Sequence, residues 1–205
     1  MRNQKAALIH LRKDPVLKQI IDRFGSLNYR PNRDRFLSLV REIISQQLSG
    51  KVADVIWGRF EKLCAGQMSS VVILSKTWEQ LRSVGMSWAK ASYVLDLANK
   101  VTDGTLQLNK LDKMTDEGIV EHLVQVKGIG RWTAEMALMF TLHRPDVLPL
   151  DDLGIQNAFV KHYGLNRSHK TLKQKMTKIA EKWHPYRTVA CWYLWKSLDN
   201  EPLKR

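Results

Sequence analysis

Two stretches of the chain combine residue types that could do chemistry. In the first, written VLPLDDLGI, Asp151 and Asp152 interrupt an apolar run. An aspartate that precedes a helix can cap it by accepting backbone N–H groups, and Asp is among the preferred capping residues. A carboxylate at a helix N-terminus also stays ionised, and in an apolar cleft it can stabilise positive charge on a reacting group. The pattern alone leaves the capping and catalytic interpretations open.

The second stretch, VKGIGRWTA, places Gly128 and Gly130 between two predicted helices. Glycine tolerates positive φ and lets another backbone come close. Such a turn presents N–H groups at the start of the next helix, where the helix dipole favours an anion such as a phosphate. The residues expected to bind a DNA backbone are Lys127, Gly128, Ile129, Gly130, Arg131 and Thr133. The alternative is an ordinary helical hairpin packed in the core.

Composition favours a polyanionic partner. The 205 residues include 33 Lys and Arg against 20 Asp and Glu, a formal net charge of +13, and the basic residues are spread along the chain. Nucleic acid is the usual partner of such a surface, although a merely basic soluble protein would have the same composition. Cys64 and Cys191 lie far apart and form no CxxC, which argues against a disulfide framework, a zinc site or an iron–sulfur cluster. No apolar run could span a bilayer and no secretory signal is present, so we expect an intracellular protein without a membrane partner.

Helical periodicity dominates the elements that must position these residues. Thr77 begins a capping box, Ser87 and Thr115 precede further helices, and Gly85, Gly104 and Gly164 follow helix ends. No strand pair stands out. We expect an all-α fold of about nine to eleven helices of ordinary length. The expected helices span about 36–48, 50–64, 78–84, 88–101, 116–126, 131–144, 153–163, 169–183 and 186–198.

At these residues the chain resembles a known family. VKGIGRWTAEMAL followed by VLPLDDLGIQNAF is similar to the helix-hairpin-helix DNA glycosylase superfamily, and within it to the alkylation-repair branch, 3-methyladenine DNA glycosylase II. The likeness runs from about Phe36 to about Leu198 and includes IISQQLSGKVA, LRSVGMSWAKA and EKWHPYRTVACWYLW. The resemblance implies one glycosylase unit, residues 1–205, made of two helical lobes with a DNA-binding cleft between them. The approximate lobes are residues 36–133 and residues 1–35 plus 134–205.

The resemblance also implies a reaction. The family motif assigns the catalytic acid to Asp152, with Asp151 as its support or cap. The implied enzyme releases alkylated bases, such as 3-methyladenine and 7-methylguanine, from double-stranded DNA by hydrolysing the N-glycosidic bond in base excision repair. Relatives that also cut the strand have a lysine where this chain has Trp132, so we expect no lyase activity. No cofactor is required, but the backbone carbonyls of Val124, Val126 and Ile129 can hold Na⁺ or K⁺ in this family.

The residues that the resemblance assigns to the base pocket are Trp132, Trp195, Met136 and Leu153. An indole face attracts the cationic ring of an alkylated purine. Met136 and Leu153 stand where the bacterial family member has tyrosines, which makes the pocket less aromatic. Lys127 stands where the family usually has proline. His184 and Arg187 belong to a matched segment, and we interpret them as structural.

The target base must leave the stack before it can react, so a side chain must fill the gap. SQQLSGK matches the family segment that inserts into the duplex, and Gln47 and Leu48 are the candidate intercalating residues. The alternative is that Leu48 is a core residue and Gln47 merely ends a helix.

Two other functions stay open at the level of sequence. One is a non-catalytic helix-hairpin-helix protein that binds DNA structures, which would need the glycines and the charge but not Asp152. The other is a glycosylase for oxidised or mismatched bases, which would need more polar groups in its pocket. We expect a monomer located with the DNA, in the cytoplasm or nucleoid, or in a nucleus. The preferred lesion does not follow from the sequence.

Overall fold

A computed structural model of the chain describes residues 4–26 and 34–198. These residues form α-helices α1–α12 and three short helical turns of other types, and they contain no strand. The expected all-α class is confirmed. None of the helices in the described part combines the length and apolar character needed to cross a membrane.

The chain divides into two compact units. The hairpin unit, described over residues 34–142, contains the glycine stretch. The Asp152 unit, described over residues 4–26 and 143–198, combines both ends of the chain. The described residues 134–142 belong to the hairpin unit, whereas the expected lobes placed them with the other unit. They do so because the helix after the glycines continues into a π-helical turn that packs against α3 in the hairpin unit.

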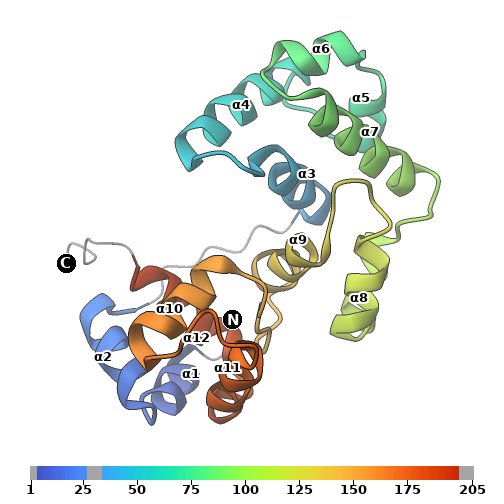
Figure 1. Cartoon of the computed structure of the whole chain (residues 1–205). Helices are drawn as coiled ribbons and strands as arrows, with labels where there is room; N and C mark the ends of the chain where they lie inside the picture. The colour runs from blue at the N-terminus through green and yellow to red at the C-terminus, as the bar shows by residue number, and fades with distance from the viewer. Residues whose placement is uncertain (1–3, 27–33, 199–205) are drawn as a thin grey trace. The chain divides into compact units, whose positions relative to one another are not determined.

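In the hairpin unit, α7 packs against α3, α5 and α6 (Figure 1). Its inward face is apolar at helical spacing and buries Ala91, Val94, Leu97 and Ala98. Helix α8 packs against α9, which begins just after the glycines. The elements of this unit are α3 (Arg35–Ser45), α4 (Gly50–Leu63), α5 (Ser70–Leu74), α6 (Trp78–Ser83), α7 (Trp88–Thr102), η1 (Leu108–Lys113), α8 (Asp116–Leu123), α9 (Arg131–Met136) and the π-helical turn η2 (Ala137–Thr141).

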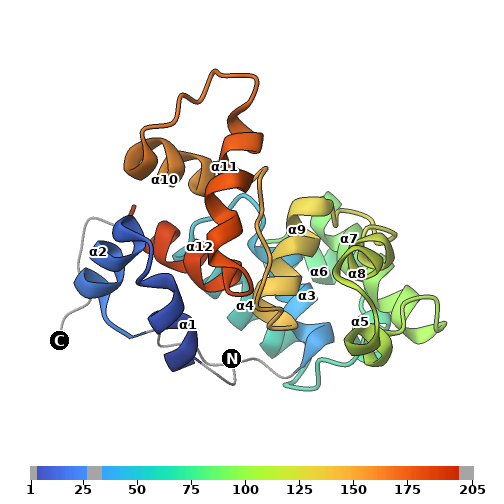
Figure 2. The same cartoon turned by 90° about the horizontal axis from the view of Figure 1, so that it is seen from below.

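In the Asp152 unit, α12 packs against α2 and α10, so that the first and last parts of the described chain share one core (Figure 2). Phe159, Trp183 and Tyr193 are among its largest fully buried side chains. The elements are α1 (Gln4–Leu11), α2 (Pro15–Phe24), α10 (Leu153–Tyr163), α11 (Leu172–Ala180), η3 (Glu181–Trp183) and α12 (Arg187–Lys196).

A buried aspartate links these elements. Asp14 is 2% exposed and caps α2 by accepting the Val16 and Leu17 N–H groups. Its Oδ2 accepts hydrogen bonds from the Tyr163 hydroxyl (3.0 Å) and the Trp183 indole N–H (2.9 Å). Burial raises the pKa of Asp14. These hydrogen bonds and Lys182 together lower the pKa by more than burial raises it, so the net pKa lies below the ordinary value.

The helix boundaries follow the predicted capping residues closely. Thr77 and Gln80 form the expected capping box, and Ser87 and Thr115 each accept an N–H group in the first turn of the helix that follows. Gly164 ends α10 in the left-handed conformation, at φ +65°. These local signals therefore fix where several helices begin and end.

Other expectations need correction. Helices α1, α2 and α5 lie outside the predicted ranges. The described residues alone therefore contain more α-helices, α1–α12, than the nine to eleven expected for the chain. Within residues 50–64, helical periodicity predicts one apolar stripe of Val52, Val55, Ile56, Phe60 and Leu63. This is partly wrong, because Val52 and Val55 are 46% and 49% exposed. The helix predicted over 169–183 begins only at Leu172.

Candidate functional site

Asp152 is both a helix cap and a buried acid. Its Oδ1 accepts a hydrogen bond from the Ile155 N–H (2.7 Å), which caps α10, and another from the Trp195 indole N–H (2.8 Å). The residue is 8% exposed. The capping and catalytic interpretations are therefore compatible, because one carboxylate caps α10 and is also largely shielded from bulk water. Donors from two helices fix the direction of this carboxylate.

Gly154 lets the Trp195 indole reach Asp152. A Cβ at position 154 would lie 2.9 Å from Trp195 Cδ1, 3.0 Å from Trp195 Nε1 and 3.1 Å from Asp152 Oδ1. A side chain there would displace the indole or the carboxylate. The sequence analysis missed Gly154. The available signal was a glycine in the first turn of a helix, where glycine is otherwise unfavourable.

Asp151 has a different environment from its neighbour. It is exposed and pairs with Lys173 of α11. Asp151 was expected to be the support or the cap of Asp152; the capping role is wrong, since the capping bond comes from Asp152. An exposed pair of this kind contributes at most about 1 kcal/mol to stability.

The segment that leads to Asp152 is held against the start of α12. Thr188 Oγ1 accepts a hydrogen bond from the Val147 N–H (3.0 Å) and donates one to the Arg144 carbonyl (2.7 Å). These two bonds join the segment to α12 on both sides of position 146. The position of Asp152 thus depends on contacts several residues before it.

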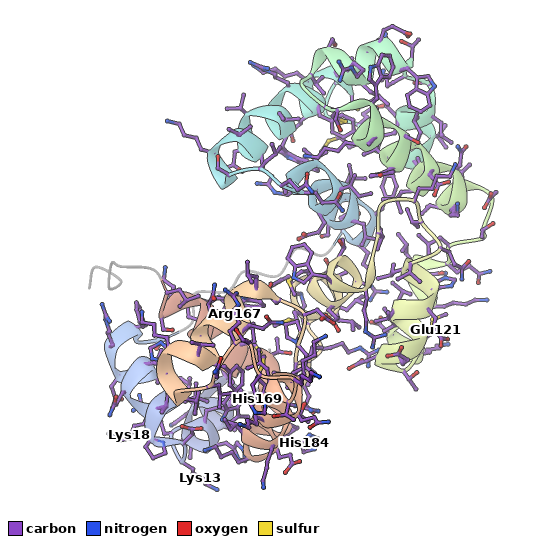
Figure 3. All side chains as sticks on the ribbon, viewed as in Figure 1. Lys13, Lys18, Glu121, Arg167, His169 and His184 are labelled. Carbon is purple, nitrogen blue, oxygen red and sulfur yellow. The ribbon has the colours of Figure 1, made fainter. Side chains whose placement is uncertain are left out.

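Position 146 carries a second anchor. Asp146 accepts a hydrogen bond from Arg187 Nε (2.7 Å). Its carboxylate also lies 2.6 Å from Nδ1 of His184, the residue that is labelled in Figure 3. Burial raises the pKa of Asp146, but the bonds from Arg187 and His184 lower it more, and the net pKa is below the ordinary value. The internal pairing of Arg187 agrees with the structural interpretation of His184 and Arg187.

In the hairpin unit, the glycine turn (residues 127–130) uses its two glycines differently. Gly128 has φ +80°, and a Cβ there would lie 2.1 Å from Tyr93 Cδ2. Gly130 has φ −88°, and a Cβ there would meet no atom within 4 Å. Only Gly128 therefore requires glycine by both conformation and space.

The backbone of the glycine turn is fixed by two side chains that the sequence analysis missed. Asp96 Oδ2 accepts the Lys127 N–H (2.9 Å), and Gln46 Nε2 donates to the Gly128 carbonyl (2.8 Å). A proline at position 127 could not make the first bond, because it has no N–H. Because Lys127 stands where the family usually has proline, this turn gains the backbone hydrogen bond to Asp96.

Arg131 and Thr133 differ from the expectation for phosphate-binding side chains. Arg131 donates to both Glu117 oxygens (2.8 and 2.7 Å), so its charge is compensated within the protein. Those bonds also raise its pKa. The Thr133 side chain is 5% exposed, which leaves only its backbone for such a role. The Lys127 side chain is exposed, as expected.

The four predicted pocket residues divide between the units. Trp132 in the hairpin unit is 43% exposed, whereas Met136, one turn further along α9, is 5% exposed and belongs to the core. In the Asp152 unit, Leu153 is 61% exposed and Trp195 is half-buried against Asp152. The indole of Trp132 is therefore the better candidate for contact with a base, and Met136 is a poor one.

The candidate intercalating residues lie in the wedge turn (residues 46–49), which joins α3 to α4. Gln47 is exposed and has φ +56°, an uncommon conformation for a residue with a side chain. Leu48 is of intermediate burial, so it is not fully buried in the core. The intercalating role of the two residues stays a prediction.

The proposed cation at Val124, Val126 and Ile129 stays a prediction. The Val126 carbonyl accepts the Ile129 N–H (3.0 Å), and a carbonyl oxygen has a second lone pair for a cation. The described residues contain no group of three or more His, Cys, Asp or Glu that could hold a metal. Backbone carbonyls are the donors on which this prediction rests.

Comparison with known proteins identifies the family. Residues 40–185 match the model of the HhH-GPD superfamily base excision DNA repair protein. The match covers more than half of the chain, and the chain belongs to this superfamily, as its motifs indicated.

Individual relatives agree with this assignment. DNA-3-methyladenine glycosylase 1 of Schizosaccharomyces pombe is 37% identical over 201 residues, which cover 93% of this chain and 86% of the relative. A Bacillus subtilis relative is 35% identical over 168 residues, and the match covers 78% of this chain but only 58% of that protein. The solved structure of the S. pombe 3-methyladenine DNA glycosylase Mag1 in complex with abasic DNA has a TM-score of 0.80 and 36% identity, covering 94% of this chain and 96% of that one.

Proposed function

We propose that this protein is a monofunctional DNA glycosylase that releases alkylated purines, such as 3-methyladenine and 7-methylguanine, from double-stranded DNA in base excision repair. The observation that carries the proposal is the Asp152 carboxylate, 8% exposed and oriented by the Ile155 and Trp195 N–H groups. Membership of a base excision repair superfamily and the 37% identity to a 3-methyladenine glycosylase support it.

The reaction breaks the bond between C1′ and the purine nitrogen. The bonding electrons leave with the base, and positive charge develops on the deoxyribose toward an oxocarbenium ion. A fixed carboxylate beside the sugar stabilises that charge where water is excluded. Asp152 can also orient the attacking water and accept its proton, which completes the hydrolysis.

A cationic purine is the substrate class that suits these residues. Alkylation at N3 or N7 gives the ring a positive charge, and the base then departs neutral, so the leaving group needs little assistance. The exposed Trp132 indole offers a face for cation–π contact, worth about 1–2 kcal/mol when desolvated. Such recognition requires few hydrogen bonds and tolerates several lesions.

The same Trp132 supports hydrolysis without strand cleavage. A lyase reaction needs an amine that attacks C1′ and forms a Schiff base, and an indole cannot do this. Lys127 lies on the other side of Gly128 and Gly130. The product expected is therefore an intact strand with an abasic site.

The proposed partner is double-stranded DNA, bound by a monomer without a required cofactor. The net charge of +13 favours a polyanion. The enzyme would work where DNA is located, in a nucleoid or a nucleus.

The test is to incubate methylated duplex DNA with the protein and identify the free bases released. Asp152→Asn should reduce release by at least about 100-fold, the usual loss when an electrostatic stabiliser is removed. Asp151→Asn is the matched control, because its carboxylate is exposed and paired with Lys173. We expect Asp151→Asn to stay within about 3-fold of the wild type.

Three outcomes would contradict the proposal or a part of it. Duplex binding without release of any base from wild-type protein would favour the non-catalytic DNA-binding alternative. Equal release by Asp152→Asn and wild type would exclude Asp152 as the catalyst. Strand cleavage, or an adduct trapped by borohydride on abasic DNA, would overturn the monofunctional assignment alone.

A further inference from the structure

Helix α7 contacts both of the turns that would meet DNA in the hairpin unit. Lys90, Tyr93 and Asp96 follow one another at intervals of three residues, so they lie along one side of the helix. Each of the three residues faces a different part of the wedge turn or the glycine turn. None of them was singled out by the sequence analysis.

Lys90 holds the beginning of the wedge turn. Its Nζ donates to the Ile44 carbonyl (2.8 Å) and to the Gln46 carbonyl (2.6 Å), at the point where α3 ends. The last carbonyls of a helix have no partner within the helix and carry partial negative charge, so a cation stabilises them. Burial lowers the pKa of Lys90, which agrees with an ammonium group that faces the protein.

Tyr93 and Asp96 hold the glycine turn. The Tyr93 ring occupies the space that a side chain at Gly128 would need, since that Cβ would lie 2.1 Å from the ring. Asp96 accepts the Lys127 N–H at 2.9 Å and is itself held by Lys100 Nζ at 2.8 Å. The backbone on both sides of the Lys127–Gly128 bond thus rests on α7.

A hydrogen bond also links the wedge turn directly to the glycine turn. Gln46, whose carbonyl accepts from Lys90, donates through its own side chain to the Gly128 carbonyl at 2.8 Å. The wedge turn, the glycine turn and α7 are therefore connected pairwise. A displacement of one turn relative to the other would break at least one of these contacts.

We propose that Lys90, Tyr93 and Asp96 are positioning residues that keep the wedge turn and the glycine turn at a fixed separation. This rests on the proposed function and on the expectation from the sequence that one turn enters the base stack while the other holds the phosphate backbone. The wedge turn must enter the base stack on the same stretch of duplex whose phosphates the glycine turn binds. The distance between the two turns therefore determines whether a lesion is extruded. Lys90 acts through the wedge turn and contacts no DNA.

The test compares Lys90→Met with Lys90→Arg and with Lys62→Met, an exposed lysine of α4 as control. Three quantities are measured for each protein: single-turnover base release, affinity for undamaged duplex at several salt concentrations, and affinity for a duplex with a tetrahydrofuran abasic-site analogue. Circular dichroism and thermal unfolding establish that each variant is folded at the assay temperature.

We expect Lys90→Met to lower base release by about 10- to 100-fold, since a displacement of about 1 Å can cost that much. Its preference for the abasic-site duplex over undamaged duplex should fall by about 10-fold. Undamaged-duplex affinity should stay within about 2-fold and its salt dependence should not change. Lys90→Arg, which can still donate to two carbonyls, should recover most of the loss, and Lys62→Met should behave as wild type.

Several outcomes would overturn the proposal. If Lys90 contacts phosphate, Lys90→Met reduces the salt slope by about 0.9 and weakens all duplexes alike. Release and duplex preference equal to those of the wild type would also contradict it. Should Lys90→Met not fold, Gln46→Leu is measured instead, because it removes only the bond to Gly128. An unchanged preference of Gln46→Leu for the abasic-site duplex would then contradict the proposal.

Failure of the proposed function has a different signature. A wild-type protein that releases no base removes the catalytic premise, but the ratio of the two duplex affinities still measures the separation of the turns. A wild-type protein that releases bases while Lys90→Met is unaffected leaves the glycosylase proposal standing and removes only the role of α7.

Discussion

The two units hold their candidate functional groups in opposite ways. In the Asp152 unit, the candidate acid Asp152 is 8% exposed, and like the structural Asp14, which is 2% exposed, it accepts a hydrogen bond from a tryptophan indole. In the hairpin unit, Trp132, Gln47 and Lys127 have exposed side chains, and the fixed part is the backbone beneath them. An acid that must act at one atom is fixed by buried donors. Groups that meet an extended partner are left at the surface on a rigid turn.

The glycine turn offers the largest expected effect. Gly128→Ala places a Cβ 2.1 Å from the Tyr93 ring at φ +80°, so we expect a loss of about 2–4 kcal/mol of unfolding free energy and weaker binding to every duplex. Gly130→Ala is the control, because its φ is −88° and its Cβ would meet nothing within 4 Å. Denaturant unfolding and duplex titration measure both. Equal behaviour of the two variants would mean that the turn does not depend on Gly128.

Asp14 tests how far buried donors stabilise the other unit. Asp14→Asn replaces a carboxylate that accepts from Trp183 and Tyr163, and we expect a loss of about 3 kcal/mol of unfolding free energy. Asp22→Asn is the control, since Asp22 forms only exposed pairs with Arg12 and Lys18 and should change stability by less than about 1 kcal/mol. Similar losses of unfolding free energy from both substitutions would contradict the larger stabilisation assigned to the buried Asp14.

Asp14 also predicts a pH dependence. Its folded-state pKa lies below the ordinary value of 3.8, so the unfolded chain binds more protons around pH 4. Its contribution to stability is therefore present above about pH 5 and is lost as the pH falls through the folded-state pKa. Unfolding measured from pH 6 to pH 3 should show a steeper acid loss for wild type than for Asp14→Asn. Parallel curves would exclude Asp14 as a source of the loss.

A smaller effect is expected from the indole that orients the candidate catalytic acid. Trp195→Phe keeps a ring but removes the N–H that donates to Asp152 at 2.8 Å. We expect base release to fall by about 10-fold, corresponding to a hydrogen bond to a charged group, with undamaged-duplex affinity unchanged. Single-turnover release and duplex titration measure the two properties. A proportional loss of duplex affinity would assign Trp195 to binding instead.

The smallest effects distinguish two neighbouring cations. Arg131 is paired with Glu117, whereas the Lys127 side chain is exposed, so Lys127→Gln should reduce the salt slope of duplex binding by about 0.9. Arg131→Gln should change that slope much less and alter stability by less than about 1 kcal/mol. The same slope for both variants would show that the Glu117 pair opens on DNA.

Local chemistry made much of the fold predictable. Thr77, Ser87 and Thr115 cap helices because a hydroxyl can accept N–H groups in the first turn, which depends only on nearby sequence. The exposed Val52 and Val55 were misjudged for the opposite reason. Apolar periodicity states which residues share a face, but a tertiary neighbour decides whether the face is covered.

The candidate site divides in the same manner. Asp152 and Gly128 could be identified because a motif carries them. Gly154 offered only the weak signal of a glycine in the first turn of a helix. Lys90 and Asp96 offered none, since each acts through a residue distant in sequence, such as Ile44 or Lys127. The pairing of Arg131 with Glu117 also depends on how α8 packs against α9, which composition does not reveal.

The two units differ in when their parts are synthesised on the ribosome. Residues 34–142 are contiguous, so the hairpin unit can complete its core while the remainder is still being synthesised. Helix α2 must wait, because Asp14 reaches Tyr163 and Trp183 and the Gly25 carbonyl accepts from Tyr193. The partners that bury α2 are therefore synthesised only after the hairpin unit, whereas the hairpin unit finds its own partners within one continuous segment.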